Sequence, residues 1–119
     1  MHIRGIDATY YTVFDIKTVA EFYTKILGEP TTTWEGRLAE WELADQNAFG
    51  LYGTPAKPTN RSGSVMFAVD DLDATIADLR TNGIQLEGDG AISEGEHCRM
   101  AFGQDPEGNQ FILHQRRGI

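Results

Sequence analysis

The chain has 119 residues, a mass of 13.2 kDa and a formal net charge of −8. Its hydrophobic content of 40% and charged content of 24% are those of an ordinary globular domain and exclude a disordered chain. The negative charge repels phosphate backbones and anionic lipid headgroups, so we expect neither a nucleic acid nor a membrane surface as a partner.

The cysteine content and the N-terminal residues bear on cellular location. Cys98 is the single cysteine, which excludes an internal disulfide and is typical of a reducing compartment. The first residues, MHIRGIDATYY, lack the apolar run of a signal peptide, and no stretch approaches the ~20 apolar residues of a membrane span. We therefore expect a soluble, cytoplasmic domain.

The first half of the chain predicts one strand, one helix and three further strands. Residues 5–14 are rich in β-branched and aromatic types, which favours a strand. Asp15 follows as the expected N-cap of a helix, and apolar residues recur at helical spacing from Ile16 until Gly28 ends the run. Three short strands are then expected at residues 31–34, 37–43 and 47–53.

The same order is predicted a second time after a linker. The proline-containing segment 54–62 has no apolar periodicity and separates a first module, 1–53, from a second module, 63–119. The second module predicts a strand over 63–71 and a helix over 72–83 that stops at Asn82-Gly83. Short strands are expected around 85–87, 97–103 and 109–115, the last two joined by a turn at 105–108.

An offset of 56 residues superimposes the two modules in sequence. It places Thr9 on Val65, Tyr11 on Phe67 and Asp15 on Asp71, which keeps the inside and outside positions in phase. One such module is too small to bury both faces of its own sheet. The expected fold is therefore α+β: two βαβββ modules, paired into one curved, barrel-like mixed sheet with the helices outside, in a single domain.

Three stretches of the chain resemble the vicinal oxygen chelate superfamily, which includes glyoxalase I, bleomycin-resistance proteins, extradiol dioxygenases and fosfomycin-resistance enzymes. They are VFDIKTVAEFYTKILGEP, VMFAVDDLDATIADLRTNGI and CRMAFGQDPEGNQFILHQRR. The resemblance covers essentially the whole chain and implies paired βαβββ modules around a concave cavity, commonly in a homodimer. It does not specify a reaction, because this scaffold carries many activities.

The resemblance also implies where metal ligands would lie. In its metal-dependent members the ligands occupy four strand positions, which here hold Ala8, Gly50, Ser64 and Ile112. None of these residues supplies a thiolate, an imidazole or a carboxylate, and a divalent metal needs about three or four N, O or S donors. We therefore expect a metal-free protein without a cofactor.

Strand alternation predicts which side chains line the cavity. If Ala8 and Ser64 point inward, their neighbours two residues away do so as well, and the same argument applies to the last two strands. The candidate ligand-binding residues are Tyr10, Thr12, Tyr52, Ser64, Met66, His97, Arg99, Gln110 and His114. On the strand over 97–103, Cys98, Met100 and Phe102 are expected to pack beneath the helices instead, which would leave the Cys98 thiol inert.

Several of these residues have a structural interpretation beside the functional one. Arg99 would bind a carboxylate, a phosphate or a carbonyl group of a ligand, or else form an ion pair with an acidic residue such as Glu40 or Glu42. His97 and His114 would shuttle protons, hydrogen-bond a ligand, or have purely structural roles. The aromatic residues would line a ligand groove or belong to the core: Tyr10, Tyr52, Trp34, Trp41 and Phe49.

Two classes of function are compatible with these residues. The first is a metal-free binding protein for a small organic molecule, similar to the bleomycin-resistance proteins; the acidic balance suits a cationic ligand. The second is a metal-independent lyase or isomerase in which Arg99 polarises a carbonyl and His97 or His114 acts as acid or base. The sequence shows no nucleophile and base together, which favours binding.

Overall fold

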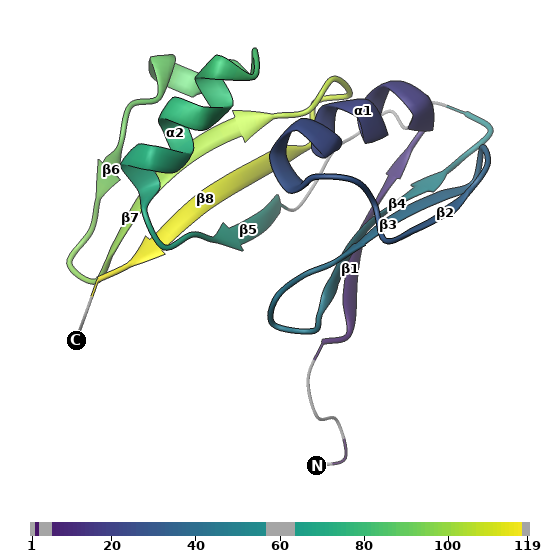
Figure 1. Ribbon diagram of the computed structural model, residues 1–119, viewed down its shortest axis with the longest axis horizontal. Helices are drawn as coiled ribbons and strands as arrows, with labels where there is room; N and C mark the ends of the chain where they lie inside the picture. The colour runs from purple at the N-terminus through teal and green to yellow at the C-terminus, as the bar shows by residue number, and fades with distance from the viewer. Residues whose placement is uncertain (1, 3–5, 57–63, 118–119) are drawn as a thin grey trace. The chain divides into compact units, whose positions relative to one another are not determined.

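The structure is a computed structural model that describes residues 2, 6–56 and 64–117. The chain divides into two compact units, Met1–Asn60 and Arg61–Ile119, each with one long helix packed against its own sheet (Figure 1). The boundary between the units falls in the segment expected as a linker, of which residues 57–62 lie outside the described part. Neither long helix in the described ranges has the length and apolarity needed to cross a membrane.

The first unit is a mixed four-stranded sheet with one helix. Its strands lie in the order β1-β4-β3-β2, with β1 parallel to β4 and the other neighbours antiparallel. The elements are β1 (Ala8–Val13), α1 (Ile16–Leu27), β2 (Thr32–Trp34), β3 (Leu38–Glu42) and β4 (Ala48–Gly53).

The second unit repeats this topology with the order β5-β8-β7-β6, β5 being parallel to β8. Its elements are β5 (Ser64–Ala68), α2 (Leu72–Thr81), the 3₁₀ helix η1 (Glu87–Asp89), β6 (Ser93–Glu94), β7 (Cys98–Gln104) and β8 (Gln110–Arg116). The α+β class and the repeated βαβββ order are confirmed. The pairing of the two modules into one barrel-like sheet stays a prediction.

Local hydrogen bonds explain where the helices begin and end. The Asp15 carboxylate accepts from the Thr18 amide at 3.2 Å, and the Asp71 carboxylate accepts from the Ala74 amide at 3.1 Å, so both expected N-caps are confirmed. After α2, Gly83 adopts a φ of +80°, and the Ile84 amide returns to the Leu79 carbonyl at 2.9 Å. This αL closure is the left-handed stop that Asn82-Gly83 predicts.

The core of the first unit is aromatic and lies between α1 and the sheet. Tyr23 and Phe49 pack with ring centroids 4.8 Å apart, Trp41 lies 6.3 Å from Tyr23, and all three are at most 2% exposed. The Trp41 indole N–H donates to the Gly28 carbonyl at 2.7 Å. Trp41 and Phe49 are thus core residues, whereas Trp34 remains 61% exposed.

One predicted strand is wrong. Residues 85–87 were expected to form a strand, but Glu87 begins η1, and the short strand of this region is β6. Gly88 and Gly90 have φ values of +59° and +82°, so the chain turns here instead of extending. The turn at 105–108 is confirmed, since the Gly108 amide donates to the Asp105 carbonyl at 2.9 Å.

Candidate functional site

Each sheet has one face against its helix and one face without a helix, which we call the helix-free face. In β1, Tyr11 and Val13 are buried on the helix side, as alternation predicts, whereas Tyr10 and Thr12 lie on the helix-free face and are exposed. The candidate residues of the first unit, including Tyr52 in β4, therefore share one surface.

The strand register aligns this surface into two rows across the four strands. One row runs from Tyr10 through Gly50 and Glu40 to Thr32, and each pair is directly opposed in the sheet. The next row holds the more apolar side chains and consists of Thr12, Tyr52, Leu38 and Trp34. Because registered neighbours point to the same side of a sheet, these side chains form one continuous surface.

Tyr10 reaches across Gly50 to Glu40. The Tyr10 hydroxyl donates to Oε1 of Glu40, two strands away. A Cβ at position 50 would lie 2.6 Å from Cε2 of Tyr10, so only glycine lets the ring lie flat over β4. The hydrogen bond to the carboxylate, together with partial burial and the negative charge, raises the pKa of Tyr10 to about 12.

The first unit contains a cation–π contact between two of its own side chains. The Arg37 guanidinium carbon lies 5.3 Å from the centroid of the Trp34 ring, within the range of a cation–π contact. Trp34 is on the helix-free face, at the end of the row that contains Leu38 and Tyr52.

The helix-free face of the second unit carries a central apolar row with polar residues beside it. Met66, Ile112 and Phe102 are directly opposed across β5, β8 and β7. The candidates Ser64, Gln110 and His114 lie on the same face by register, and Met66 is 50% exposed. The structure thus brings together four of the candidate residues in this unit.

The prediction of which β7 side chains face the helix is wrong. Cys98, Met100 and Phe102 oppose Arg116, His114 and Ile112 and share the helix-free face, whereas Ala101 opposes the buried Leu113 and is fully buried. The reason is volume: the Phe111 ring fills the helix side so closely that a Cβ at Gly103 would lie 2.4 Å from it. Position 103 must therefore be a glycine facing the helix side, which turns Cys98, Met100 and Phe102 to the opposite face.

This reversal removes Arg99 from the candidate site. Its guanidinium donates to Asp73 of α2 at 3.1 Å and to Glu94 of β6 at 3.0 Å, and the side chain is only 21% exposed. Arg99 therefore forms structural ion pairs, with partners other than the expected Glu40 and Glu42. His97 precedes β7 with the same alternation phase, and its side chain is 62% exposed beside Glu96.

The residue missed by sequence reasoning is Glu40. Alternation alone places it on the same face of β3 as Leu38, because the flanking Ala39 and Trp41 are buried. Its place beside Tyr10 depends on the order β1-β4-β3, which pattern and spacing do not give.

The four positions at which the family resemblance implies metal ligands fit no divalent metal. Ala8 and Gly50 belong to β1 and β4, and Ser64 and Ile112 belong to β5 and β8. Their side chains offer a single oxygen, the Ser64 hydroxyl, and the space above Gly50 is taken by the Tyr10 ring. Among the residues that the structure describes, no group of three His, Cys, Asp or Glu side chains is placed to hold a metal ion.

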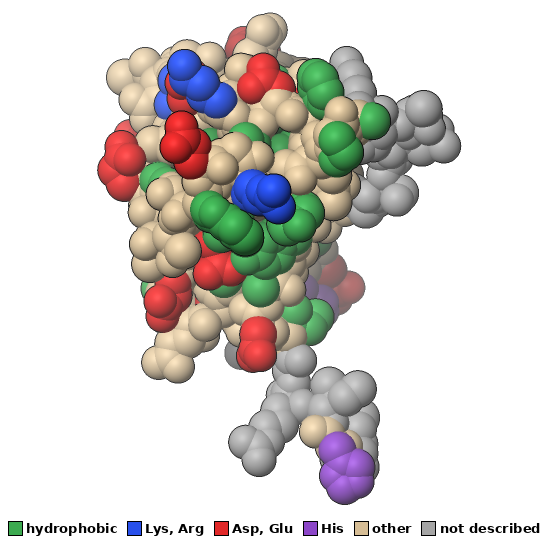
Figure 2. Space-filling model, turned by 90° about the vertical axis from the view of Figure 1, so that its right-hand side faces the viewer, with side chains coloured by type: hydrophobic (Ala, Val, Ile, Leu, Met, Phe, Trp, Pro, Cys, Tyr) green, Lys and Arg blue, Asp and Glu red, His purple; other side chains and the backbone are tan. Residues whose placement is uncertain are grey.

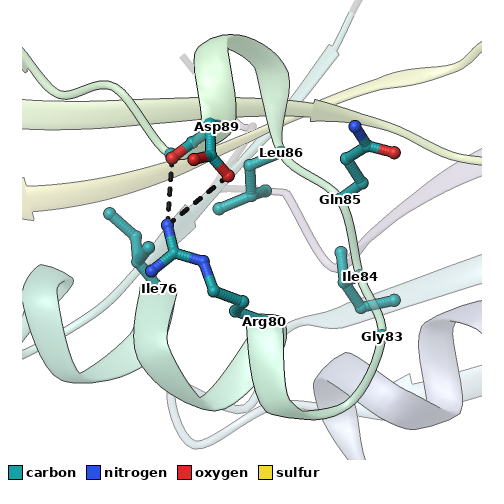
Figure 3. A pocket seen from close by; sticks show the side chains of 8 residues that line it. Ile76, Arg80, Gly83, Ile84, Gln85, Leu86 and Asp89 are labelled. Atoms are coloured by element: carbon teal, nitrogen blue, oxygen red, sulfur yellow. Dashed lines mark hydrogen bonds and ion pairs between the residues drawn. The ribbon is translucent and has the colours of Figure 1, made fainter.

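A separate pocket lies at the C-terminal end of α2, within the second unit. It has a volume of about 270 Å³ and is lined by Ile76, Ile84, Leu86 and Arg80, among others (Figure 3). Arg80 is held at its rim by the Asp89 carbonyl at 3.0 Å and the Asp89 carboxylate at 3.7 Å. No candidate residue from the sequence lies in this pocket.

Surface charge by itself identifies no site. On the face shown in Figure 2, acidic side chains are scattered among hydrophobic ones instead of gathering at one point. On this face, therefore, charge does not mark a site, and a site must be argued from individual contacts.

Comparison with known proteins identifies the family. The model of the glyoxalase/bleomycin resistance protein/dioxygenase superfamily matches residues 5–113, so the chain belongs to this superfamily. No match is found among functionally curated proteins.

Solved structures share the fold at low sequence identity. A glyoxalase/bleomycin resistance protein of Catenulispora acidiphila is 19% identical, with a TM-score of 0.76, over 93% of this chain and 98% of that one. A lactoylglutathione lyase of Agrobacterium tumefaciens is 17% identical, with a TM-score of 0.78, over 97% and 96%. A Vibrio cholerae integron cassette protein is 23% identical, with a TM-score of 0.73, over 97% of each chain. At these identities the likeness shows the fold alone.

Proposed function

We propose that this protein binds a small organic molecule without a metal ion, on the helix-free face of its first unit. The observation that carries the proposal is the surface made by Tyr10, Glu40 and Tyr52, in which two exposed aromatic rings lie near a hydrogen-bonded carboxylate. Small-molecule sites combine apolar walls with a few polar groups in this way. Tyr10 and Tyr52 remain 38% and 44% exposed, so their rings are available for contact.

The helix-free face of the second unit also combines apolar and polar side chains. Met66 supplies a flexible, exposed apolar side chain, with the buried Ile112 and then Phe102 beside it in the row, and Gln110 and His114 supply hydrogen-bonding groups on either side. This composition suits a ligand with both apolar and polar parts.

The absence of a metal ion from the proposal is supported by the side chains at the four positions where the resemblance implies metal ligands. These positions hold Ala8, Gly50, Ser64 and Ile112. A single hydroxyl among them falls short of the three or four donors of a divalent site. Glyoxalase and dioxygenase chemistry depend on such a metal, so ligand binding is favoured over either reaction. The lyase or isomerase alternative required a free Arg99, and the Asp73 and Glu94 contacts of that side chain count against it.

The test is a titration of ¹⁵N-labelled protein with a set of neutral, cationic and anionic aromatic compounds, followed by amide chemical shifts. We expect at least one compound to shift amides of β1, β3 and β4, and Tyr52→Ala to weaken that binding about fivefold through lost ring contact. Ile6→Ala is the matched control, since Ile6 is an exposed apolar residue outside the strands. A compound set that shifts no amide of the first unit's helix-free face would overturn the proposal.

The assembly and location of the protein are also proposals. We propose a homodimer, because a second copy of the chain would cover edge strands and the exposed Trp34 ring. Light scattering should then give twice the chain mass of 13.2 kDa. We further propose a cytoplasmic protein with neither nucleic acid nor membrane as partner, in keeping with its acidic charge.

A further inference from the structure

Glu40 is the acidic residue in the row of side chains that runs from Tyr10 to Thr32 on the helix-free face of the first unit. Its side chain is half-buried and accepts one hydrogen bond, from the Tyr10 hydroxyl to Oε1. Among the ion pairs of the described residues, none joins Glu40 to a basic side chain. Within the described part of the chain the Glu40 carboxylate thus has no cationic partner, and its second oxygen, Oε2, accepts no hydrogen bond.

A molecule that covers this face removes water from the Glu40 carboxylate, and that loss must be compensated. A phenol hydroxyl supplies a hydrogen bond but no positive charge, so it does not neutralise Glu40. Removing water from an uncompensated carboxylate is costly, and the cost falls when the arriving group is itself positive. A neutral ligand would leave the charge unpaired, and an anionic ligand would be repelled.

The rings beside Glu40 favour the same kind of ligand. Tyr10 and Tyr52 present exposed aromatic surface on the same face, and an aromatic face attracts a cation through its quadrupole. The chain shows this chemistry with its own residues, because the Arg37 guanidinium rests 5.3 Å from the Trp34 ring centroid.

We infer that Glu40 is the anchor for an organic cation, an ammonium or guanidinium carried on an aromatic or apolar group that rests against Tyr10 and Tyr52. This inference rests on the proposed function and names the ligand class for the same surface. Tyr10 is then a positioning residue, because it holds one carboxylate oxygen of Glu40 and leaves the other for the ligand.

The experiment compares three probes of matched size by amide chemical-shift titration: benzylamine, which is a cation at neutral pH, benzyl alcohol and phenylacetate. We expect benzylamine to shift amides of β1, β3 and β4 and to bind at least about tenfold more tightly than benzyl alcohol. Phenylacetate should bind more weakly than either. Glu40→Gln keeps the shape of the side chain and should reduce benzylamine binding to the level of benzyl alcohol.

Glu42→Gln is the matched control, since it removes the same charge from the same strand and face, two residues away. We expect it to change benzylamine binding less than about twofold. Equal binding of benzylamine to the wild type and to Glu40→Gln would overturn the inference. An equal loss of benzylamine affinity in Glu40→Gln and Glu42→Gln would also overturn it, because it would indicate general charge attraction. If benzyl alcohol and phenylacetate bind this face as well as benzylamine, the proposed function survives and the cation inference fails. If no probe shifts these amides, the inference fails and the wider compound set decides the proposed function.

Discussion

Tyr10 and Glu40 show how one glycine creates a contact between strands that are not neighbours. Gly50 lies between them in the sheet, and its missing Cβ is the space through which the Tyr10 ring passes. A Cβ at this position would lie 2.6 Å from the Tyr10 ring, so a larger residue would displace the ring from its present position. The contact that defines the candidate site therefore depends on a residue with no side chain.

The Tyr10–Glu40 contact predicts a pH dependence. The pKa of Tyr10 is raised from 10.0 to about 12, mainly by the hydrogen bond to Glu40, so the folded state favours the protonated phenol. The stability from this contact is therefore fully present below pH ~10, the ordinary tyrosine pKa, and is lost as the pH rises through about 12.

Glu40→Gln should lower the pKa of Tyr10 toward its ordinary value, because both the carboxylate acceptor and the negative charge are removed. The measurement is an NMR titration of the Tyr10 Cζ resonance, with Glu42→Gln as the control that leaves the hydrogen bond intact. An unchanged Tyr10 titration in Glu40→Gln would show that the two residues do not interact in solution.

Arg99 should matter for stability and not for ligand binding. Its side chain is 21% exposed and joins Asp73 to Glu94, although these partners are 69% and 52% exposed and so are screened by water. We expect Arg99→Ala to lower the free energy of unfolding by about 1–2 kcal/mol, measured by urea denaturation.

Arg80→Ala is the comparison for Arg99→Ala, because the Arg80 side chain is 61% exposed and its ion pair with Asp89 is longer, at 3.7 Å. It should cost less than about 0.5 kcal/mol. Loss of ligand affinity in Arg99→Ala at unchanged stability would return Arg99 to the candidate site.

At the scale of elements, the β7–β8 hairpin depends on one buried carboxylate. Asp105 is 5% exposed, and its Oδ1 accepts from the amides of Glu107 at 2.8 Å and Asn109 at 2.9 Å. Its Oδ2 accepts from the Asn109 side chain at 2.8 Å, and Asn109 is itself buried. The turn thus satisfies its polar groups internally, which allows it to be buried.

Asp105→Ala should lower the free energy of unfolding by about 2–4 kcal/mol, because it leaves buried donors unsatisfied. Asp45→Ala is a closely matched control: Asp45 accepts from the Asn47 amide at 3.0 Å and from the Asn47 side chain at 3.2 Å, but in an exposed turn. It should cost less than about 1 kcal/mol. Similar losses in urea denaturation for both variants would show that burial of the Asp105 turn contributes nothing.

At the scale of the whole molecule, the donor set predicts how the protein responds to metals. Addition of EDTA should leave the melting temperature unchanged, since only a metal bound to the native state would stabilise it. Elemental analysis of the purified protein should find no stoichiometric divalent metal. A fully occupied site, or a lower melting temperature in EDTA, would contradict the metal-free proposal.

Features that depend on neighbours in the chain could be predicted from the amino-acid sequence. The caps at Asp15 and Asp71 and the turn at 105–108 each involve residues at most four positions apart, so local pattern is enough to predict them. The burial of Tyr11 and Val13 in β1 also followed from alternation, once the family resemblance gave Ala8 as an inward position.

The orientation of the β7 side chains and the contact partner of Tyr10 could not be predicted in this way, because both depend on how the strands pack. Alternation divides a strand into two faces, but the partner strand determines which face has room. Here the Phe111 ring on β8 leaves no space for a Cβ at position 103. Tyr10 and Glu40 are 30 residues apart and meet through the sheet order β1-β4-β3. Both outcomes depend on volume and strand order across the sheet, which are properties of packed strands and not of any one segment.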